Sequence, residues 1–153
     1  MLESIRTFLH EHDVSFREVH HEPTFTSEQS ALARGESVTI GGKALLIKVE
    51  DEFKLFVLSA ECKLDSKALK KHFAVKNLRF ASKEELAELT GLVPGSVPPF
   101  GRPLLDFDLY IDESIFANEQ IAFNAGSLTD SIIMSVADYV RVTPHERLQF
   151  SRT

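Results

Sequence analysis

The fold is decided by the stretch from Ala44 to Leu58, which has the sequence ALLIKVEDEFKLFVL. Its first four residues form an apolar run that is typical of a buried strand. Phe53 to Leu58 predicts a second strand. The polar residues Asp51 and Glu52 lie between the two runs and favour a turn. We therefore expect an antiparallel hairpin at the centre of the fold.

Both helices and strands are expected on either side of this hairpin. Apolar periodicity and capping residues predict helices over residues 2–12, 26–35, 64–73, 82–91, 113–117 and 138–141. Alternation predicts further strands over residues 14–19, 75–80, 107–112, 121–123 and 131–136. The sum is an α/β (α+β) fold in a single domain, residues 1–153, with a mixed six- to seven-stranded sheet flanked by helices.

The composition excludes several classes of protein. The chain has 153 residues, 43% of them hydrophobic and 26% charged, as in an ordinary soluble domain. No apolar run is long enough for a membrane helix, and the N-terminus has no signal-peptide core. One cysteine rules out an internal disulfide, so a cytoplasmic location is expected. The net charge of −6 argues against DNA binding over the whole surface.

The segment from Gly91 to Gly101 (GLVPGSVPPFG) holds six of the thirteen glycines and prolines of the chain. Such a segment cannot be a helix or a central strand, because proline lacks an N–H and glycine favours turns. It is also uncharged. Two interpretations are equally open at this point: the loop forms the wall of a binding site, or it is a rigid crossover between core elements.

Lys43 follows two glycines and opens the most apolar strand. It could face a cleft and hold an anion, since glycines allow the backbone to approach a ligand closely. Alternatively, it is a strand-end lysine whose stem reaches toward water.

A basic segment spans residues 63–83, with seven Lys or Arg residues and one acid, Asp65. Lys63, Lys67, Lys70 and Lys71 share the spacing of one helical face. Such a stripe could follow a phosphate backbone, or it could simply be a solvated helix face.

No metal site and no cofactor are expected. The spacing of the histidines does not place them on one helical face, and Cys62 has no neighbouring cysteine. Asp106, Asp108 and Asp112 alternate, which favours the solvent side of a strand over a catalytic acid pair. No motif of a serine hydrolase, metalloprotease or P-loop protein is present.

The sequence resembles the YbaK/prolyl-tRNA-synthetase-associated-domain family of aminoacyl-tRNA editing proteins. The Gly91–Gly101 element is the most specific part of this resemblance. The other matching segments, in order, are Gly42–Leu46, Leu78–Ala81, Tyr110–Asp112 and Phe123–Ser127.

The resemblance implies a free-standing deacylase that hydrolyses the ester between a wrong amino acid and the 3′ end of a tRNA, on a barrel-like mixed sheet. By position, Lys43 matches the family's functional lysine, which is thought to hold the terminal adenosine or its phosphate. The backbone N–H of Gly95 could stabilise the oxyanion. The other site residues implied are, in the loop, Gly91, Pro94, Pro98 and Phe100; on the opposite side, Asn124, Gly126 and Ser127; and, more loosely, His21 and Thr26.

The implied partner is the acceptor end of tRNA, with Lys67, Lys70 and Lys71 as candidate contacts. Whether an aminoacyl-tRNA synthetase delivers the substrate stays open, and no membrane is involved. The Gly41–Ala44 context favours the branch that clears serine and threonine, because the alanine branch has an asparagine where this chain has Ala44. Alanine and cysteine remain alternatives. So do a non-catalytic binder of tRNA ends or nucleotides and a hydrolase of another small ester.

Overall fold

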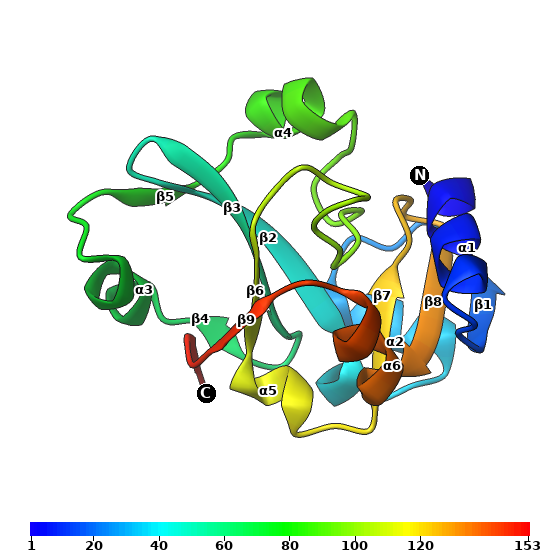
Figure 1. Ribbon diagram of the computed structural model, residues 1–153. Coiled ribbons are helices and arrows are strands. Elements are labelled where there is room, and N and C mark those ends of the chain that lie inside the picture. Colours follow the sequence, from blue (N-terminus) through cyan, green and yellow to red (C-terminus); the bar gives the residue numbers. More distant parts are fainter.

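The computed structural model describes residues 1–153, with helices arranged around two main β-sheets (Figure 1). The helices are α1 (Leu2–Glu11), α2 (Ser27–Arg34), α3 (Ser66–Phe73), α4 (Lys83–Thr90), α5 (Glu113–Phe116) and α6 (Val136–Val142), with a 3-10 turn at Val38–Ile40. The strands are β1 (Phe16–His20), β2 (Gly42–Val49), β3 (Glu52–Ser59), β4 (Lys63–Leu64), β5 (Leu78–Phe80), β6 (Leu109–Asp112), β7 (Gln120–Asn124), β8 (Asp130–Ser135), β9 (Glu146–Leu148) and β10 (Ser151–Arg152).

The larger sheet has five strands in the order β5-β2-β3-β6-β9. β2 and β3 form the predicted antiparallel hairpin, in which Leu45 lies opposite Phe56. β3 pairs with β6, and β6 with β9, in parallel. The sheet is therefore mixed, and the predicted α/β class with helices flanking a mixed sheet is confirmed.

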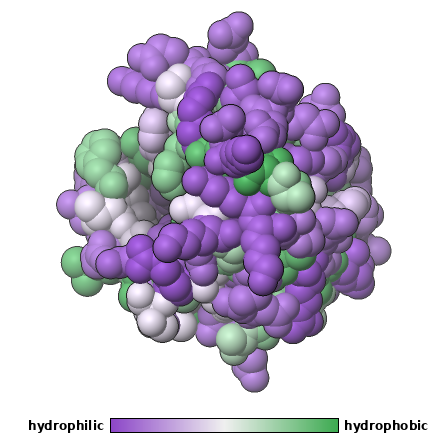
Figure 2. Space-filling view, turned by 90° about the vertical axis from the view of Figure 1, so that its left-hand side faces the viewer, coloured by the Kyte–Doolittle hydropathy of each residue, from purple (hydrophilic) through white to green (hydrophobic).

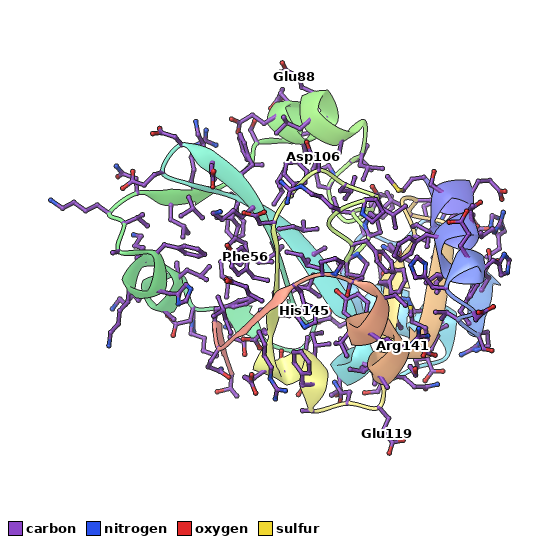
Figure 3. All side chains as sticks on the ribbon, in the orientation of Figure 1. Phe56, Glu88, Asp106, Glu119, Arg141 and His145 are labelled. Carbon is purple, nitrogen blue, oxygen red and sulfur yellow. The ribbon has the colours of Figure 1, made fainter.

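Alternate side chains of the hairpin pack on opposite faces of this sheet, as the two-residue period of a strand requires. Leu46, Leu55 and Val57 belong to the main core of 23 buried residues. Ile47 and Phe56 face the other way, into a cluster of seven buried residues to which α3 contributes. Figure 3 shows Phe56 on the α3 side of the sheet. The hairpin thus supplies both hydrophobic clusters.

A second sheet, with the order β1-β8-β7, is antiparallel throughout. It meets the larger sheet at Gly41, which forms a single parallel bridge with Ala122. A Cβ atom on Gly42 would lie 2.6 Å from the Cδ1 atom of Ile121. The two sheets therefore approach more closely than any side chain at Gly42 would allow.

The strand arrangement differs in detail from the six- to seven-stranded sheet that was expected. The ten strands are divided among three sheets, the smallest of which pairs β10 with β4. β4, β9 and β10 were not predicted, because two or three residues are too few to show a periodic pattern. The helix predicted over residues 64–73 begins only at Ser66, with Asp65 as its N-cap, so Lys63 lies before the helix and not on its face.

The predicted helix boundaries at Ser82 and Gly91 are confirmed. Ser82 and Glu85 form both hydrogen bonds of a capping box at the start of α4. Gly91 ends that helix in the left-handed conformation, with φ of 75°. Thr26 caps α2 by accepting a hydrogen bond from the Gln29 N–H. None of the helices is long and apolar enough to cross a membrane.

The loop from Gly91 to Gly101 is anchored from beneath by aromatic packing. Phe100 is only 1% exposed. Its ring makes edge contacts with Phe123 and Tyr139, at centroid distances of 5.4 and 5.6 Å. The buried Tyr139 hydroxyl donates a 2.6 Å hydrogen bond to the Pro99 carbonyl. The inner side of the loop is therefore part of the core, and its outer side is held in place.

The alternation of Asp106, Asp108 and Asp112 does not mark a solvent-facing strand, because Asp112 is fully buried. Its carboxylate accepts hydrogen bonds from the backbone N–H of Phe150 at 2.6 Å and of Ser114 at 2.9 Å. Asp112 therefore joins the C-terminal segment to the end of β6 and caps α5.

We predict that Asp112→Ala lowers the free energy of unfolding by about 2–4 kcal/mol, because two N–H groups lose their acceptor. Urea unfolding of the purified protein measures this change. Asp106→Ala is the matched control: the Asp106 side chain is 94% exposed, and its loss should leave stability unchanged. Equal stability of the two variants would contradict this role of Asp112.

Candidate functional site

A cleft of about 240 Å³ opens where α2, the start of β2, the end of β7 and the Gly91–Gly101 loop meet. It lies where the two main sheets come together, beside Gly41 and Gly42. Its lining contains two cations, Lys43 and Arg34, and no carboxylate. The cleft is therefore suited to a ligand that carries negative charge.

Lys43 lies on one wall of the cleft. It is on the face of β2 that carries the cluster of seven buried residues to which α3 contributes. The register places it opposite Leu58, which belongs to that cluster. Its Nζ atom donates a 2.6 Å hydrogen bond to the Cys62 carbonyl. Burial lowers the pKa of Lys43, while the carboxylate of Glu28 acts in the opposite direction. An ammonium has three N–H donors, so Lys43 can also bind a ligand.

Arg34, the last residue of α2, forms the floor of the cleft and is only 8% exposed. Its Nε atom donates to the Ser131 hydroxyl at 2.9 Å, and its Nη2 atom donates to Asn124 Oδ1 at 3.1 Å. Burial lowers the pKa of Arg34 to about 10. The side chain therefore stays charged at neutral pH, although no acid pairs with it.

Asn124 joins the floor of the cleft to the loop. Its Nδ2 atom donates a 2.8 Å hydrogen bond to the Gly95 carbonyl, while Oδ1 accepts from Arg34. Turning the amide over would place donor against donor at Arg34 and acceptor against acceptor at Gly95. The orientation of the amide is therefore fixed, and the second N–H of Nδ2 is available to a ligand.

His21 does not line the cleft and contacts Ser131, which in turn contacts Arg34. Its Nδ1 atom donates to the Glu22 carbonyl, and its Nε2 atom lies 2.8 Å from the Ser131 hydroxyl. Ser131 in turn accepts from Arg34. His21 therefore acts on the cleft only through Ser131 and does not reach it directly.

The structure brings together four of the predicted site residues, Lys43, Gly95, Thr26 and Asn124, all of which line the cleft. The hydroxyl of Thr26 is partly used as the cap of α2. Pro94 lines a smaller, more apolar pocket of about 170 Å³ that shares Gly95 with the cleft.

The other predicted residues lie outside the cleft lining. Pro98 and Phe100 are buried on the inner side of the loop, and Gly91 is an exposed helix end. Gly126 is covered by Met1, since a Cβ atom at Gly126 would lie 2.4 Å from the Met1 Cγ atom. The Ser127 hydroxyl is engaged with Thr129.

The lysines Lys67, Lys70 and Lys71 are exposed on α3, and none of them forms a salt bridge. α3 lies on the opposite side of the molecule from α1 (Figure 1). Figure 2 shows that this side is mostly hydrophilic. Lys43 and α3 share one face of the larger sheet, so the free lysines and the cleft lysine lie on the same side of β2.

Sequence reasoning missed Arg34. A basic residue in the last turn of a helix interacts favourably with the helix dipole, so an arginine there is expected on the protein surface without any role in a site. The available signal was helical spacing: Ala31 and Arg34 lie three positions apart, on the face of α2 that is buried. The structure also contains no group of three or more His, Cys, Asp or Glu residues that could hold a metal ion.

Comparison with known proteins gives one consistent result. The sequence model of the aminoacyl-tRNA editing domain matches residues 21–142, which include every segment that lines the cleft. The chain is 36% identical over 151 residues to the multifunctional Ser/Thr-tRNA deacylase ProXp-y of Escherichia coli (strain K12), covering 95% of this chain and 89% of the relative. It is also 34% identical over 100 residues to a proline–tRNA ligase of Shouchella clausii, covering 65% of this chain but only 17% of the ligase.

Solved structures show the same fold. A candidate trans-editing enzyme for prolyl-tRNA synthetase superimposes with a TM-score of 0.85 at 23% identity, over 99% of this chain and 97% of the other. The hypothetical protein APE2540 superimposes with the same TM-score at 21% identity, over 97% of this chain and 99% of the other.

We predict that Ser131→Ala lowers the free energy of unfolding by about 1–3 kcal/mol, because the buried Nε atom of Arg34 loses its acceptor. Chemical denaturation measures the effect. Ser4→Ala, at an exposed position of α1, is the control and should leave the midpoint unchanged. A Ser131→Ala protein as stable as the control would show that this hydrogen bond does not hold Arg34 in place.

Proposed function

This chain belongs to the aminoacyl-tRNA editing domain family, and we propose that it is a deacylase that acts in trans on mischarged tRNA. Its substrate is the ester between a small amino acid, serine or threonine in the first place, and the terminal ribose of the tRNA. The similarity to an E. coli Ser/Thr-tRNA deacylase over almost the full length of both chains supports this assignment.

The observation that carries the proposal is the composition of the cleft. Lys43 from β2, Gly95 from the loop and Asn124 from β7 converge on one space without any carboxylate. A tRNA 3′ end brings phosphates and an ester whose carbonyl oxygen becomes negative during hydrolysis. Cations and N–H donors are the groups that such a substrate requires.

Hydrolysis needs few dedicated acid–base residues, because an aminoacyl ester is already activated and a bound water is held close to it. The water oxygen attacks the ester carbon, and the carbonyl electron pair moves onto the oxygen. When the carbonyl re-forms, the bond to the ribose oxygen breaks, and that oxygen takes the proton that the water gives up. The products are the free amino acid and a tRNA with its terminal hydroxyl.

Lys43 and Gly95 have different roles in this reaction. Lys43 acts as an electrostatic clamp on the terminal nucleotide, using the N–H donors that Cys62 does not occupy. Gly95 forms no hydrogen bond through its own N–H within the protein, so this group is free to bind the developing oxyanion. The positive φ of Gly95, 86°, is a conformation that glycine adopts readily.

We expect wild-type protein to release serine and threonine faster than alanine, cysteine or proline from charged tRNAs. Lys43→Ala should lower kcat/KM by about 100-fold or more, because the clamp is lost. The measurement is deacylation at substrate concentrations below KM. Lys48→Ala is the matched control: Lys48 lies on the same strand and its ammonium lies over the Phe53 ring, outside the cleft.

Three results would change the assignment. Lys43→Ala with wild-type kcat/KM would remove the clamp from the mechanism. Preferred release of alanine or cysteine would change the amino acid but keep the reaction. Binding of tRNA with no release of any amino acid would make the protein a tRNA-end binder, and hydrolysis of small esters without tRNA would make it an esterase of another kind.

We further propose that Lys67, Lys70 and Lys71 contact the acceptor stem. Replacing all three with alanine should weaken tRNA binding and lower the slope of log Kd against log salt by about three units, since each phosphate contact releases counterions. Amino-acid preference should stay unchanged. Binding titrations at several salt concentrations measure the slope.

The control for this experiment removes the same charge from the other side of the molecule. Arg6, Arg17 and Arg141 are paired with carboxylates, on α1, β1 and α6. Replacing these three should leave the salt slope as in wild type. If both triple variants have the same slope, the effect comes from net charge and not from a contact at α3.

A further inference from the structure

A buried cation without a counter-ion is the most unusual feature of the cleft. Six other arginines form salt bridges with carboxylates (Arg6, Arg17, Arg79, Arg102, Arg141 and Arg147). Arg34 is more than nine-tenths buried and contacts only the neutral groups of Ser131 and Asn124. Burying a charge in this way costs free energy, and a bound anionic group would offset that cost.

The hydrogen bonds of Arg34 leave donors that face the cleft. A guanidinium has five N–H donors. One goes to Ser131 and one to Asn124, so three remain, two of them on Nη1. No fully buried polar side-chain atom lacks a partner, so Nη1 is not sealed inside the protein. A Cβ atom on Gly41 would lie 3.6 Å from Nη1, and glycine at this position leaves the guanidinium uncovered.

Arg34 also determines which group Asn124 presents. Because Arg34 occupies Oδ1 and the Gly95 carbonyl occupies one N–H of Nδ2, the free group of Asn124 is a donor. The floor of the cleft thus presents N–H groups from Arg34 and Asn124 and no acceptor from either side chain. These N–H groups are suited to bind an oxygen atom that carries negative charge.

We propose that Arg34 is a catalytic residue that binds the carbonyl oxygen of the scissile ester and stabilises it as an oxyanion. This inference rests on the deacylase function proposed above. The electron pair that leaves the carbonyl bond on water attack is held by the Nη1 donors and the free N–H of Asn124, together with the backbone N–H of Gly95. Arg34 keeps its protons throughout, since its pKa remains well above neutral pH.

A phosphate group fits Arg34 less well than the ester oxygen. A phosphodiester in tRNA carries the polynucleotide on both sides and therefore binds where the cleft is open. Lys43 is only half-buried, and the exposed lysines of α3 lie on its side of the sheet. Arg34 is held rigidly at two of its nitrogen atoms in the buried floor, which is the preorganisation that oxyanion stabilisation requires.

The test compares Arg34→Met and Arg34→Lys with wild type on threonyl-tRNA. Arg34→Met removes the charge, and kcat should fall about 100- to 1,000-fold while KM changes by less than about threefold. Arg34→Lys keeps the charge but cannot reach Ser131, Asn124 and the ester together, and should recover only part of kcat. Arg17→Met, at an exposed ion pair on β1, is the control and should behave as wild type.

Binding of uncharged tRNA separates the proposal from its competitors. Uncharged tRNA has the phosphate of its 3′-terminal nucleotide but no aminoacyl ester. Its Kd should therefore be the same for wild type and both Arg34 variants. A weaker Kd with unchanged kcat would assign Arg34 to a phosphate and overturn the proposal. If Arg34→Met fails to fold, Arg34→Lys decides alone, and a folded Arg34→Lys protein with wild-type kcat would also overturn it. Inactive wild-type protein would instead refute the deacylase function itself.

Discussion

The close approach of two β-sheets at Gly41 and Gly42 is the constraint on which the cleft depends. A Cβ atom on Gly42 would collide with Ile121, and one on Gly41 would lie 3.0 Å from the Ala60 Cβ atom. Because both positions are glycine, β2 can start directly against β7. The next residue, Lys43, is thereby placed at the cleft, and Arg34 from α2 reaches Asn124 across the same junction.

The loop that closes the cleft owes its shape to the core beneath it. Phe100 fills a space among Phe8, Phe123 and Tyr139, and the Tyr139 hydroxyl holds the Pro99 carbonyl. With one side fixed in this way, the other side can present the backbone of Gly95 at a constant position. Catalysis by backbone N–H groups depends on this, because such groups can be aimed only by the fold.

The sequence allowed much of the fold to be predicted, because its signals are local. The hairpin, the capping box at Ser82 and the helix end at Gly91 each depend on a few neighbouring residues. Family resemblance, and not residue chemistry alone, directed attention to Lys43, Gly95 and Asn124, which the structure brings together.

The rest depended on tertiary contacts that no local pattern shows. Loop composition could not distinguish Gly95, which lines the cleft, from Phe100, which supports it. Alternation could not show that β6 is buried on both faces, so Asp112 was wrongly assigned to a solvent side. Arg34 had a sufficient local explanation as a helix-end cation, and only its contacts across the sheets reveal its place in the site.

The manner in which α2 is attached has a consequence for how the cleft moves. The buried residues of α2 are Ser30, Ala31 and Arg34, whereas Leu32 is 84% exposed. These residues bury little apolar surface, so polar contacts hold the helix in place, among them the hydrogen bond between Thr24 and Ser30. We therefore expect the backbone amides of α2 to exchange with solvent through local opening, at a lower free energy than those of β2 and β3. The first turns of α2 can open while Arg34, at the other end of the helix, stays bound to Ser131 and Asn124, and this opening gives a bulky polynucleotide end a way in and a way out.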